Sequence, residues 1–217
     1  MQMHKLTFRV HKETLMKLYY SPGACSLSPH IVLLEAGLPF DKVKTDTRAK
    51  TVEGGGDFYQ VNALGYVPVL ELDDGTRLTE GPAIVQYIAD QAPAKKLAPA
   101  NGTFERTKLQ TWLNFTTSEL HKGFSPLFNP TMPDEAKKIF RARLGTRFAY
   151  VDKHLASNDY LMGKDFSVAD AYAFVVSNWA GRVDVDLSTH ANVLAWRKRV
   201  GARPAVQEAM KAEGLIK

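Results

Sequence analysis

The residue of this chain best suited to chemistry is Cys25, its only cysteine, in the segment Tyr20-Ser21-Pro22-Gly23-Ala24-Cys25-Ser26. An apolar run at residues 16–20 indicates a strand before it, and residues 27–36 indicate a helix after it. A thiol at such a turn faces the free backbone N–H groups of the helix start, which favour an anion. This placement predicts a lowered thiol pKa and a reactive thiolate. The competing interpretation is a small buried side chain without chemistry.

The elements that must position this turn alternate between strand and helix patterns. Four segments indicate strands: 17–20, 41–45, 67–72 and 76–79. Asp73-Asp74-Gly75 indicates a hairpin turn between the last two. Helices are predicted at 27–36, ended by Gly37, and at 83–89, while 51–56 indicates a glycine-rich loop. The order predicts a small mixed four-stranded sheet with helices packed on it.

Strand patterns stop at residues 93–102, where proline, glycine and small residues indicate a linker. Five helical patterns follow, at residues 106–124, 134–155, 167–179, 191–200 and 205–212. The predicted fold class is therefore an α/β domain, residues 16–92, followed by an all-helical domain, residues 103–217. Residues 1–15 are expected to be an N-terminal extension outside this fold, because Met16 offers a second plausible start. At the start of the third of these helical patterns, Ser167-Val168-Ala169-Asp170 predicts a structural capping box.

Composition narrows the class of protein. The 217 residues are 45% hydrophobic and 24% charged, as in an ordinary globular protein. No apolar run is long enough for a membrane span and no signal peptide is visible, so we expect a cytoplasmic protein without a membrane partner. One cysteine excludes an internal disulfide. The net charge of +5 is spread among acidic residues without a dense basic stripe, so no nucleic-acid partner is expected.

From Met16 to Lys217 the chain resembles a cytosolic glutathione transferase, and within that family the bacterial beta class. The resemblance rests on motifs that are individually short but occur in the same order: residues 20–26, Gly65-Tyr66-Val67-Pro68, Leu78-Thr79-Glu80-Gly81, Ser118-Glu119-Leu120-His121-Lys122-Gly123-Phe124 and Phe166-Ser167-Val168-Ala169-Asp170-Ala171-Tyr172. It implies a thioredoxin-like domain joined to a helical domain, usually as a homodimer. It also implies glutathione as cosubstrate; no metal is expected.

The resemblance implies a glutathione site built mainly by the first domain. Val67-Pro68 resembles a cis-proline turn, which would present the Val67 backbone to the peptide like an added strand. The Gly81 N–H would bind the γ-glutamyl carboxylate and Glu80 the neighbouring amino group. Lys50 would reach the carboxylate at the glycine end, although Arg48 is also within reach. Ala24 and Cys25 complete this part of the site.

The helical domain is expected to complete the cleft. The resemblance places His121 near the glutathione sulfur, where it can donate to a thiol or exchange a proton with it. It also suggests contacts from Asn114, Ser118 and Glu119, some of them from a partner subunit. The pocket for the small apolar electrophile is expected at four side chains: Lys122, Phe124, Phe128 and Trp179.

Two mechanisms remain open from the sequence. In one, glutathione is conjugated to an electrophile, and donors near Cys25 together with His121 favour its thiolate. In the other, Cys25 is the nucleophile and forms a mixed disulfide with glutathione, as in thiol–disulfide exchange or reductive dehalogenation. A hydroxyl helper, Tyr20 or Ser26, is a further option. A non-catalytic glutathione-binding module is a third reading, disfavoured because the thiol and the Glu80-Gly81 anion site are both retained.

Overall fold

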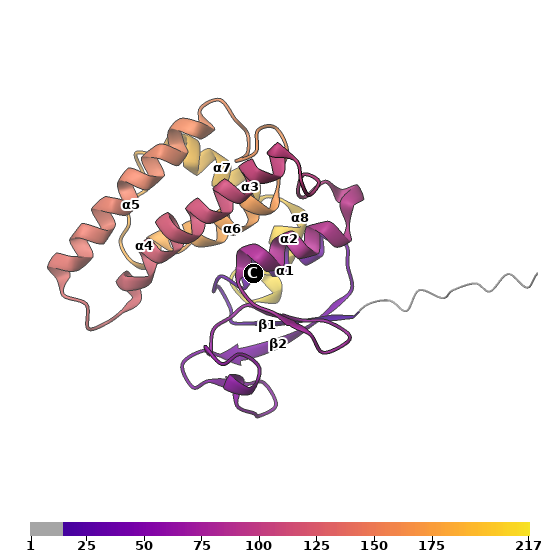
Figure 1. Ribbon diagram of the computed structural model, residues 1–217. Coiled ribbons are helices and arrows are strands. Elements are labelled where there is room, and N and C mark those ends of the chain that lie inside the picture. The colour runs from indigo at the N-terminus through magenta and orange to yellow at the C-terminus, as the bar shows by residue number, and fades with distance from the viewer. Residues whose placement is uncertain (1–14) are drawn as a thin grey trace, which may run out of the picture.

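The computed structural model describes residues 15–217, so the expected N-terminal extension, apart from Leu15, lies outside the described residues. The first part of the chain forms an α/β layer, and the rest forms a bundle of helices above it (Figure 1). This arrangement confirms the predicted fold class. Among the helices of residues 15–217, none combines the length and the apolar character that a membrane span requires.

The sheet has the strand order β3-β2-β1-β4-β5. Its strands are β1 Met16–Tyr20, β2 Phe40–Asp46, β3 Thr51–Val52, β4 Val69–Glu71 and β5 Arg77–Leu78. β1 and β2 are parallel because helix α1, Leu27–Ala36, connects them, and the other neighbours are antiparallel. The predicted mixed sheet and the hairpin turn at Gly75 are therefore confirmed.

The number of strands was predicted wrongly: the sheet has five strands instead of four. The additional strand β3 lies where the sequence indicated only a glycine-rich loop. Two residues are too few to show an alternating pattern, and Thr51 and Val52 become a strand by pairing with Asp46 and Thr45 of β2. The strand expected at 67–72 begins later, at Val69, because Pro68 lacks the N–H group needed for pairing.

Helices cover the sheet and form the second layer. Their bounds are α2 Gly81–Gln91, α3 Phe104–Phe115, α4 Lys122–Phe124, α5 Asp134–Leu155, α6 Val168–Ser177, α7 Ala191–Gly201 and α8 Pro204–Ala212. The continuous helix expected at 106–124 is instead divided, since a π-helical turn, Thr116–His121, separates α3 from α4. A π turn widens the backbone locally and shifts the side chains that follow, and such turns occur frequently at functional sites.

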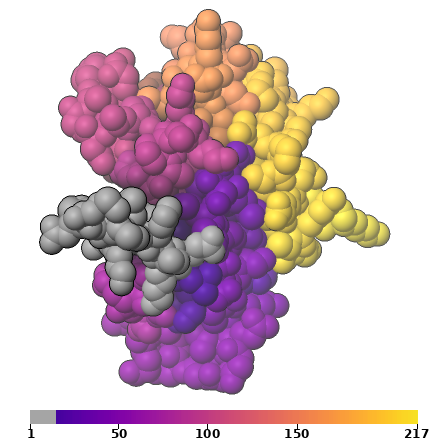
Figure 2. Space-filling model, turned by 90° about the vertical axis from the view of Figure 1, so that its right-hand side faces the viewer, coloured from indigo at the N-terminus to yellow at the C-terminus, as the bar shows by residue number. Residues whose placement is uncertain are grey.

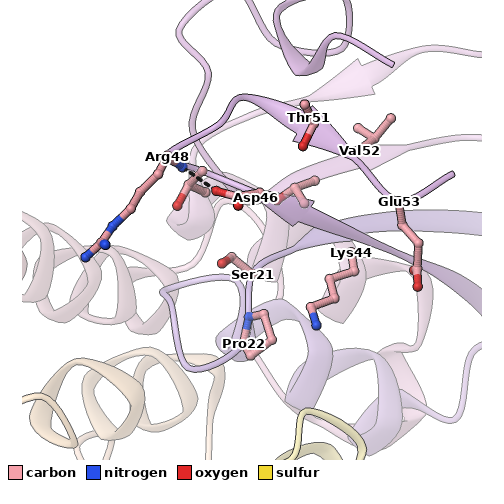
Figure 3. Close-up of a pocket in the computed structure, with 10 residues that line it drawn as sticks. Ser21, Pro22, Lys44, Asp46, Arg48, Thr51, Val52 and Glu53 are labelled. Carbon is pink, nitrogen blue, oxygen red and sulfur yellow. Dashed lines mark hydrogen bonds between the residues drawn. The ribbon is translucent and has the colours of Figure 1, made fainter. Parts of the chain in front are cut away.

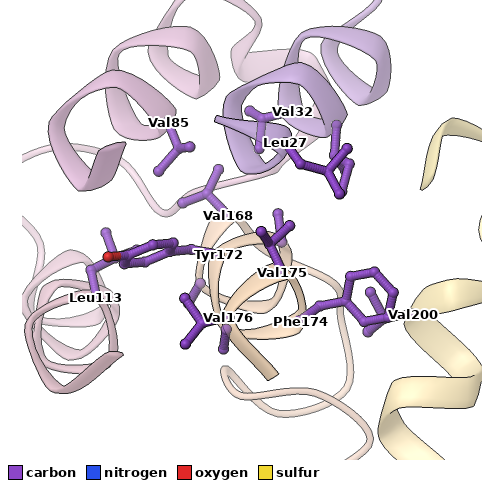
Figure 4. Close-up of a cluster of buried hydrophobic side chains, with 14 of the residues drawn as sticks. Leu27, Val32, Val85, Leu113, Val168, Tyr172, Phe174, Val175, Val176 and Val200 are labelled. Atoms are coloured by element: carbon purple, nitrogen blue, oxygen red, sulfur yellow. The ribbon is translucent and has the colours of Figure 1, made fainter. Parts of the chain in front are cut away.

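Helix α6 is the centre of the core. All ten of its residues are buried, as its apolar pattern predicted. Figure 4 shows residues of this helix below side chains of α1 and α2, with Leu113 of α3 to the left and Val200 of α7 to the right. One apolar core therefore joins the two layers, and their relative position is fixed by packing.

The capping box at the start of α6 is confirmed. The buried Asp170 carboxylate accepts hydrogen bonds from the backbone N–H and the hydroxyl of Ser167, at 3.0 and 2.9 Å. It also accepts from the Leu161 N–H and the Trp196 indole, at 2.8 and 2.9 Å. Four donors from three segments converge on one carboxylate, so the box holds the whole helical layer together and not only one helix end.

The end of the chain returns to the first layer. Helix α8 packs against α1, and the yellow C-terminal residues lie beside the indigo and purple α/β part in the space-filling view (Figures 1 and 2). The C-terminal segment is thereby placed close to the turn that carries Cys25.

Candidate active site

The turn between β1 and α1 holds Cys25 in a rigid loop. The Ser26 hydroxyl donates to the Ser21 carbonyl at 3.2 Å and accepts from the Ser21 N–H at 3.1 Å. The Ala24 N–H donates to the same carbonyl at 3.0 Å, and Gly23 takes a positive φ of 69°. This bonding engages the buried Ser26 hydroxyl within the loop. Neither Ser26 nor Tyr20 lines the pocket described below.

The Cys25 thiol donates a hydrogen bond to the Val67 carbonyl oxygen, with 3.2 Å between sulfur and oxygen. Burial raises the pKa of Cys25 to about 11, although the N–H groups of Cys25 and Ser26 act in the opposite direction. The negative charge of Glu80 adds to the increase and Lys122 opposes it. The sequence-based prediction of a lowered thiol pKa was therefore wrong: the helix start provides the expected donors, but desolvation outweighs them.

A pocket of about 620 Å³ opens at Cys25 between the two layers. Most of the predicted site residues line it: Ala24, Cys25, Lys50, Val67, Pro68, Glu80, Gly81, His121, Lys122, Phe128 and Trp179. Its volume is typical of small-molecule sites. Segments separated by more than a hundred residues in sequence thus meet around one thiol.

The α/β wall of the pocket has an unusual backbone. The Val67–Pro68 peptide bond is cis, which confirms the prediction from the resemblance. Glu80 precedes helix α2 with φ 65° and ψ 106°, a conformation that non-glycine residues rarely adopt and that clusters at ligand sites. Gly81 follows as the first residue of the helix, so its N–H lies among the free donors of the helix start. The wall therefore offers an anion site with a carboxylate beside it.

Lys50, and not Arg48, supplies the cation on this wall. The Lys50 ammonium donates to the Gly65 carbonyl at 2.9 Å and lies 5.3 Å from the centre of the Tyr66 ring. Arg48 lines a separate hollow of about 460 Å³ together with Lys44 and Glu53 (Figure 3). Of the two cations left open from the sequence, only Lys50 lines the pocket at Cys25, and its contact with glutathione stays a prediction.

The helical wall presents His121 from the π-helical turn. Its ring Nδ1 lies 2.7 Å from the Tyr172 hydroxyl, and its ring packs edge-on against Trp179 with 4.8 Å between centres. Burial, together with the charge of Lys122, lowers the pKa of His121 to about 4. Burial also raises the pKa of Tyr172. Both groups are therefore neutral near pH 7, and the histidine can donate a hydrogen bond but is a weak base.

Two hydrogen bonds hold the Cys25 loop from distant segments. The Trp179 indole N–H donates to the Gly23 carbonyl at 2.9 Å. The Gly23 N–H donates to the Glu213 carboxylate at 2.9 Å, and the other oxygen of this carboxylate lies 2.8 Å from Nδ1 of buried His30. The backbone N–H and the carbonyl of Gly23 are thus both held by side chains from the second layer.

Four predicted site residues lie outside the pocket lining in this chain. Asn114 and Ser118 are exposed, and the Ser118 hydroxyl donates to the Asn114 carbonyl at 3.0 Å. Glu119 forms ion pairs with Arg143 and Arg147 of helix α5. Phe124 is fully buried behind Trp179, with 6.0 Å between ring centres. A contact of the first three across a subunit interface stays a prediction.

Among the polar pocket residues that sequence reasoning missed, Tyr172 and Arg182 lie on the helical wall. Tyr172 belongs to a motif that was quoted for the resemblance, but its neighbours in an apolar helix indicated plain core. Arg182 ends a short 3-10 turn, Ala180–Arg182, after α6, and no local pattern marks it. A search for polar residues within the apolar helix α6 would have found Tyr172 but not Arg182.

Comparison with known proteins places the chain in a family. The model for the glutathione S-transferase N-terminal domain matches residues 23–91, and that for the C-terminal domain matches residues 115–204. The glutathione S-transferase GstA of Escherichia coli O157:H7 is 46% identical over 200 residues, covering 92% of this chain and all of the relative.

Two solved bacterial structures have the same fold. One is described as a ternary complex of BphK, a bacterial glutathione S-transferase; it has a TM-score of 0.90 and 59% identity, over 92% of this chain and all of the other. The other is the beta-class glutathione S-transferase of Sphingomonas chungbukensis, with a TM-score of 0.89 and 48% identity over the same shares. This chain belongs to the glutathione S-transferase family.

Proposed function

We propose that this protein is a beta-class glutathione transferase that conjugates reduced glutathione to small electrophiles in the pocket at Cys25. The observation that carries the proposal is the position of the Cys25 sulfur, which lines that pocket 3.2 Å from the Val67 carbonyl oxygen. The raised pKa of Cys25 favours the protonated thiol near pH 7. The single S–H proton, which points to the Val67 carbonyl here, would turn to the bound sulfur of glutathione once the peptide occupies the Val67 backbone. This donor would therefore favour the thiolate of glutathione over its thiol.

The α/β wall matches the charges of glutathione. The tripeptide carries two carboxylates and one ammonium group. The free N–H at Gly81 and the Lys50 ammonium would each take a carboxylate, and Glu80 would pair with the ammonium group. The Val67 backbone and Ala24 would hold the peptide between them. In this proposal residues 16–92 bind glutathione and residues 103–217 form most of the electrophile site.

Conjugation would then need only a stabilised glutathione thiolate and room for the electrophile to reach its sulfur. The Cys25 thiol and the neutral His121 ring would donate to the glutathione thiolate, and the charge of Lys122 would favour it further. The thiolate would attack an electrophile lying against Phe128 and Trp179, and the leaving group would depart with the bonding electron pair. Because the pKa of His121 is lowered to about 4, the proton of glutathione is expected to pass to solvent and not to this ring.

A second candidate is thiol–disulfide exchange by Cys25 itself, favoured by the position of its sulfur in the pocket wall. The Cys25 thiolate would attack oxidised glutathione, forming a mixed disulfide and releasing one reduced glutathione. The raised pKa of Cys25 disfavours this route near pH 7, since the attacking species is the thiolate. We rank it below conjugation for that reason.

The test compares conjugation of glutathione to 1-chloro-2,4-dinitrobenzene in wild type, Cys25→Ser and Cys25→Ala. A donor role predicts that the serine variant keeps most of the activity, while the alanine variant loses about tenfold in kcat/KM, as expected for one hydrogen bond to a charged group. Equal loss in both variants would favour a nucleophilic role for the sulfur. Mass spectrometry after incubation with oxidised glutathione then decides, because a mixed disulfide adds one glutathione to wild type only.

Whether the protein acts as a homodimer is tested separately, by sedimentation equilibrium. We propose a dimer in which Asn114, Ser118 and Glu119 lie near the partner's site. Dissociation without loss of activity would contradict this part of the proposal.

A further inference from the structure

The pocket has two positively charged side chains beyond those assigned above to the carboxylates and the ammonium group of glutathione. Four charged side chains line it: Lys50, Glu80, Lys122 and Arg182. Under the proposed function, Lys50 and Glu80 face glutathione from the α/β wall. Lys122 and Arg182 belong to the helical wall, on the side assigned to the second substrate.

Neither of these two cations is neutralised by the protein. Within residues 15–217, no carboxylate lies within ion-pair distance of Lys122 or Arg182. Other exposed charges of the described residues, such as Lys44, are also unpaired, so the distinguishing feature of Lys122 and Arg182 is their position in the pocket lining. Lys122 acts electrostatically on the Cys25 and His121 side chains, which places its charge at the reacting end of the pocket.

Arg182 marks the other end of an aromatic wall. Its guanidinium carbon lies 5.9 Å from the centre of the Phe128 ring, and the Phe128 ring stands edge-on to Trp179 with 5.9 Å between centres. The guanidinium also approaches the Cys25 loop: a methyl group built on Gly23 would lie 3.7 Å from its Nη1. The cation is therefore held beside an apolar surface and above the loop of the thiol.

We infer that the second substrate is an aromatic or other apolar electrophile that carries a carboxylate. Phe128 and Trp179 would contact its carbon skeleton, while Lys122 and Arg182 would bind the anionic group. This inference rests on the proposed function and narrows it from small apolar electrophiles to anionic ones. Arg182 is then a specificity-determining residue that no sequence motif marks.

The competing explanation is that Lys122 only favours the glutathione thiolate and Arg182 only covers Phe128. In that case the loss of both cations would lower the activity toward charged and neutral electrophiles by the same factor. The two explanations are therefore distinguished by the ratio of kcat/KM for the charged electrophile to kcat/KM for the neutral one. A fall in activity with one electrophile alone does not distinguish them.

The experiment uses 4-chloro-3-nitrobenzoate and its neutral amide, 4-chloro-3-nitrobenzamide. In each reaction the sulfur–carbon bond forms, the carbon–chlorine bond breaks, chloride leaves with the electron pair and the thiol proton passes to solvent. Each kcat/KM is divided by the uncatalysed rate constant, which removes the difference in intrinsic reactivity. The full-length wild type is compared with the Lys122→Met/Arg182→Met double variant.

A matched control removes two positive charges elsewhere, in Lys164→Met/Lys198→Met, whose side chains are exposed and lie outside the pocket lining. We expect wild type and control to prefer the benzoate over the amide by about tenfold, and the pocket variant to lose this preference, as for two partly exposed ion pairs. Equal preference in all three proteins would overturn the inference. If the proteins conjugate both substrates without a preference, the proposed conjugation activity would still be supported.

If neither compound reacts, a binding measurement distinguishes failure of the proposed anionic site from failure of the proposed conjugation reaction. Unreactive 4-methyl-3-nitrobenzoate and the corresponding amide are titrated into each protein with glutathione present, and quenching of tryptophan fluorescence reports occupancy beside Trp179. Tighter binding of the benzoate to wild type than to the pocket variant would support the anionic site even without turnover. Equal dissociation constants would reject it.

Discussion

The Trp179 indole N–H donates to the Gly23 carbonyl across the boundary between the two layers, at 2.9 Å. One side chain thus forms the aromatic wall of the pocket and also fixes the loop that carries the thiol. The position of Cys25 relative to the electrophile side is consequently set by a direct bond between the two walls, and not only by packing of distant elements.

Replacing Trp179 by Phe keeps an aromatic wall but removes this donor. We expect the free energy of unfolding to fall by about 1 kcal/mol, the value of one ordinary hydrogen bond. The kcat/KM for conjugation should fall more strongly, by about tenfold, because a loop shift misplaces the reacting sulfur. Steady-state kinetics and urea unfolding measure the two effects. Trp112→Phe is the control, since Trp112 packs against Phe115 and Tyr150 away from the pocket; a loss of activity there would refute the loop argument.

Glu213→Ala removes a buried acceptor shared by the Gly23 N–H and the His30 ring. The buried His30 ring and the partly buried Gly23 N–H would both lose their partner, so the free energy of unfolding should drop by about 3 kcal/mol. Glu213→Gln keeps an acceptor oxygen and should cost about 1 kcal/mol. Chemical denaturation gives both values. Glu208→Ala, on the exposed face of helix α8 just before Glu213, is the control; a similar cost there would assign the effect to the end of the chain in general.

The lowered pKa of His121 makes stability depend on pH. Since the folded-state pKa is about 4 and the unfolded value about 6.5, the unfolded chain binds the proton first as the pH falls. The stability contribution is complete above pH 6.5 and is lost as the pH falls toward 4. Between pH 7 and pH 4 the wild type should lose about 3 kcal/mol more than His121→Asn. Identical pH profiles of the unfolding free energy would show that the histidine titrates normally.

Cys25 should react slowly with iodoacetamide at pH 7. Because burial raises its pKa to about 11, its thiolate fraction is far below that of a free cysteine. We expect alkylation in the folded protein to be about tenfold or more slower than in urea, with a rate that still rises above pH 9. As the chain has one cysteine, the mass increase reports on this thiol alone. A rate that levels off near pH 7 would restore the lowered pKa expected from the helix start.

Local pattern determined much of this fold. The helices of the second layer, the α1 end at Gly37 and the capping box at Asp170 all followed from periodicity and terminal residues, because these features depend on neighbours in sequence. Strand β3 and the π-helical turn at Thr116–His121 did not, since β3 has only two residues and is defined by its pairing with β2, and the π turn depends on packing within the bundle. The cis bond before Pro68 was expected only through the family resemblance.

The sequence by itself determined that a single thiol stands at a strand-to-helix turn, with an anion site, a histidine and aromatic residues farther along the chain. Only the tertiary structure decided which of them meet, placing Tyr172 and Arg182 in the pocket and Glu119 in ion pairs outside it. It also reversed the expected sign of the Cys25 pKa shift. The physical reason is that desolvation and charge act through space, so they depend on which distant segments cover a group.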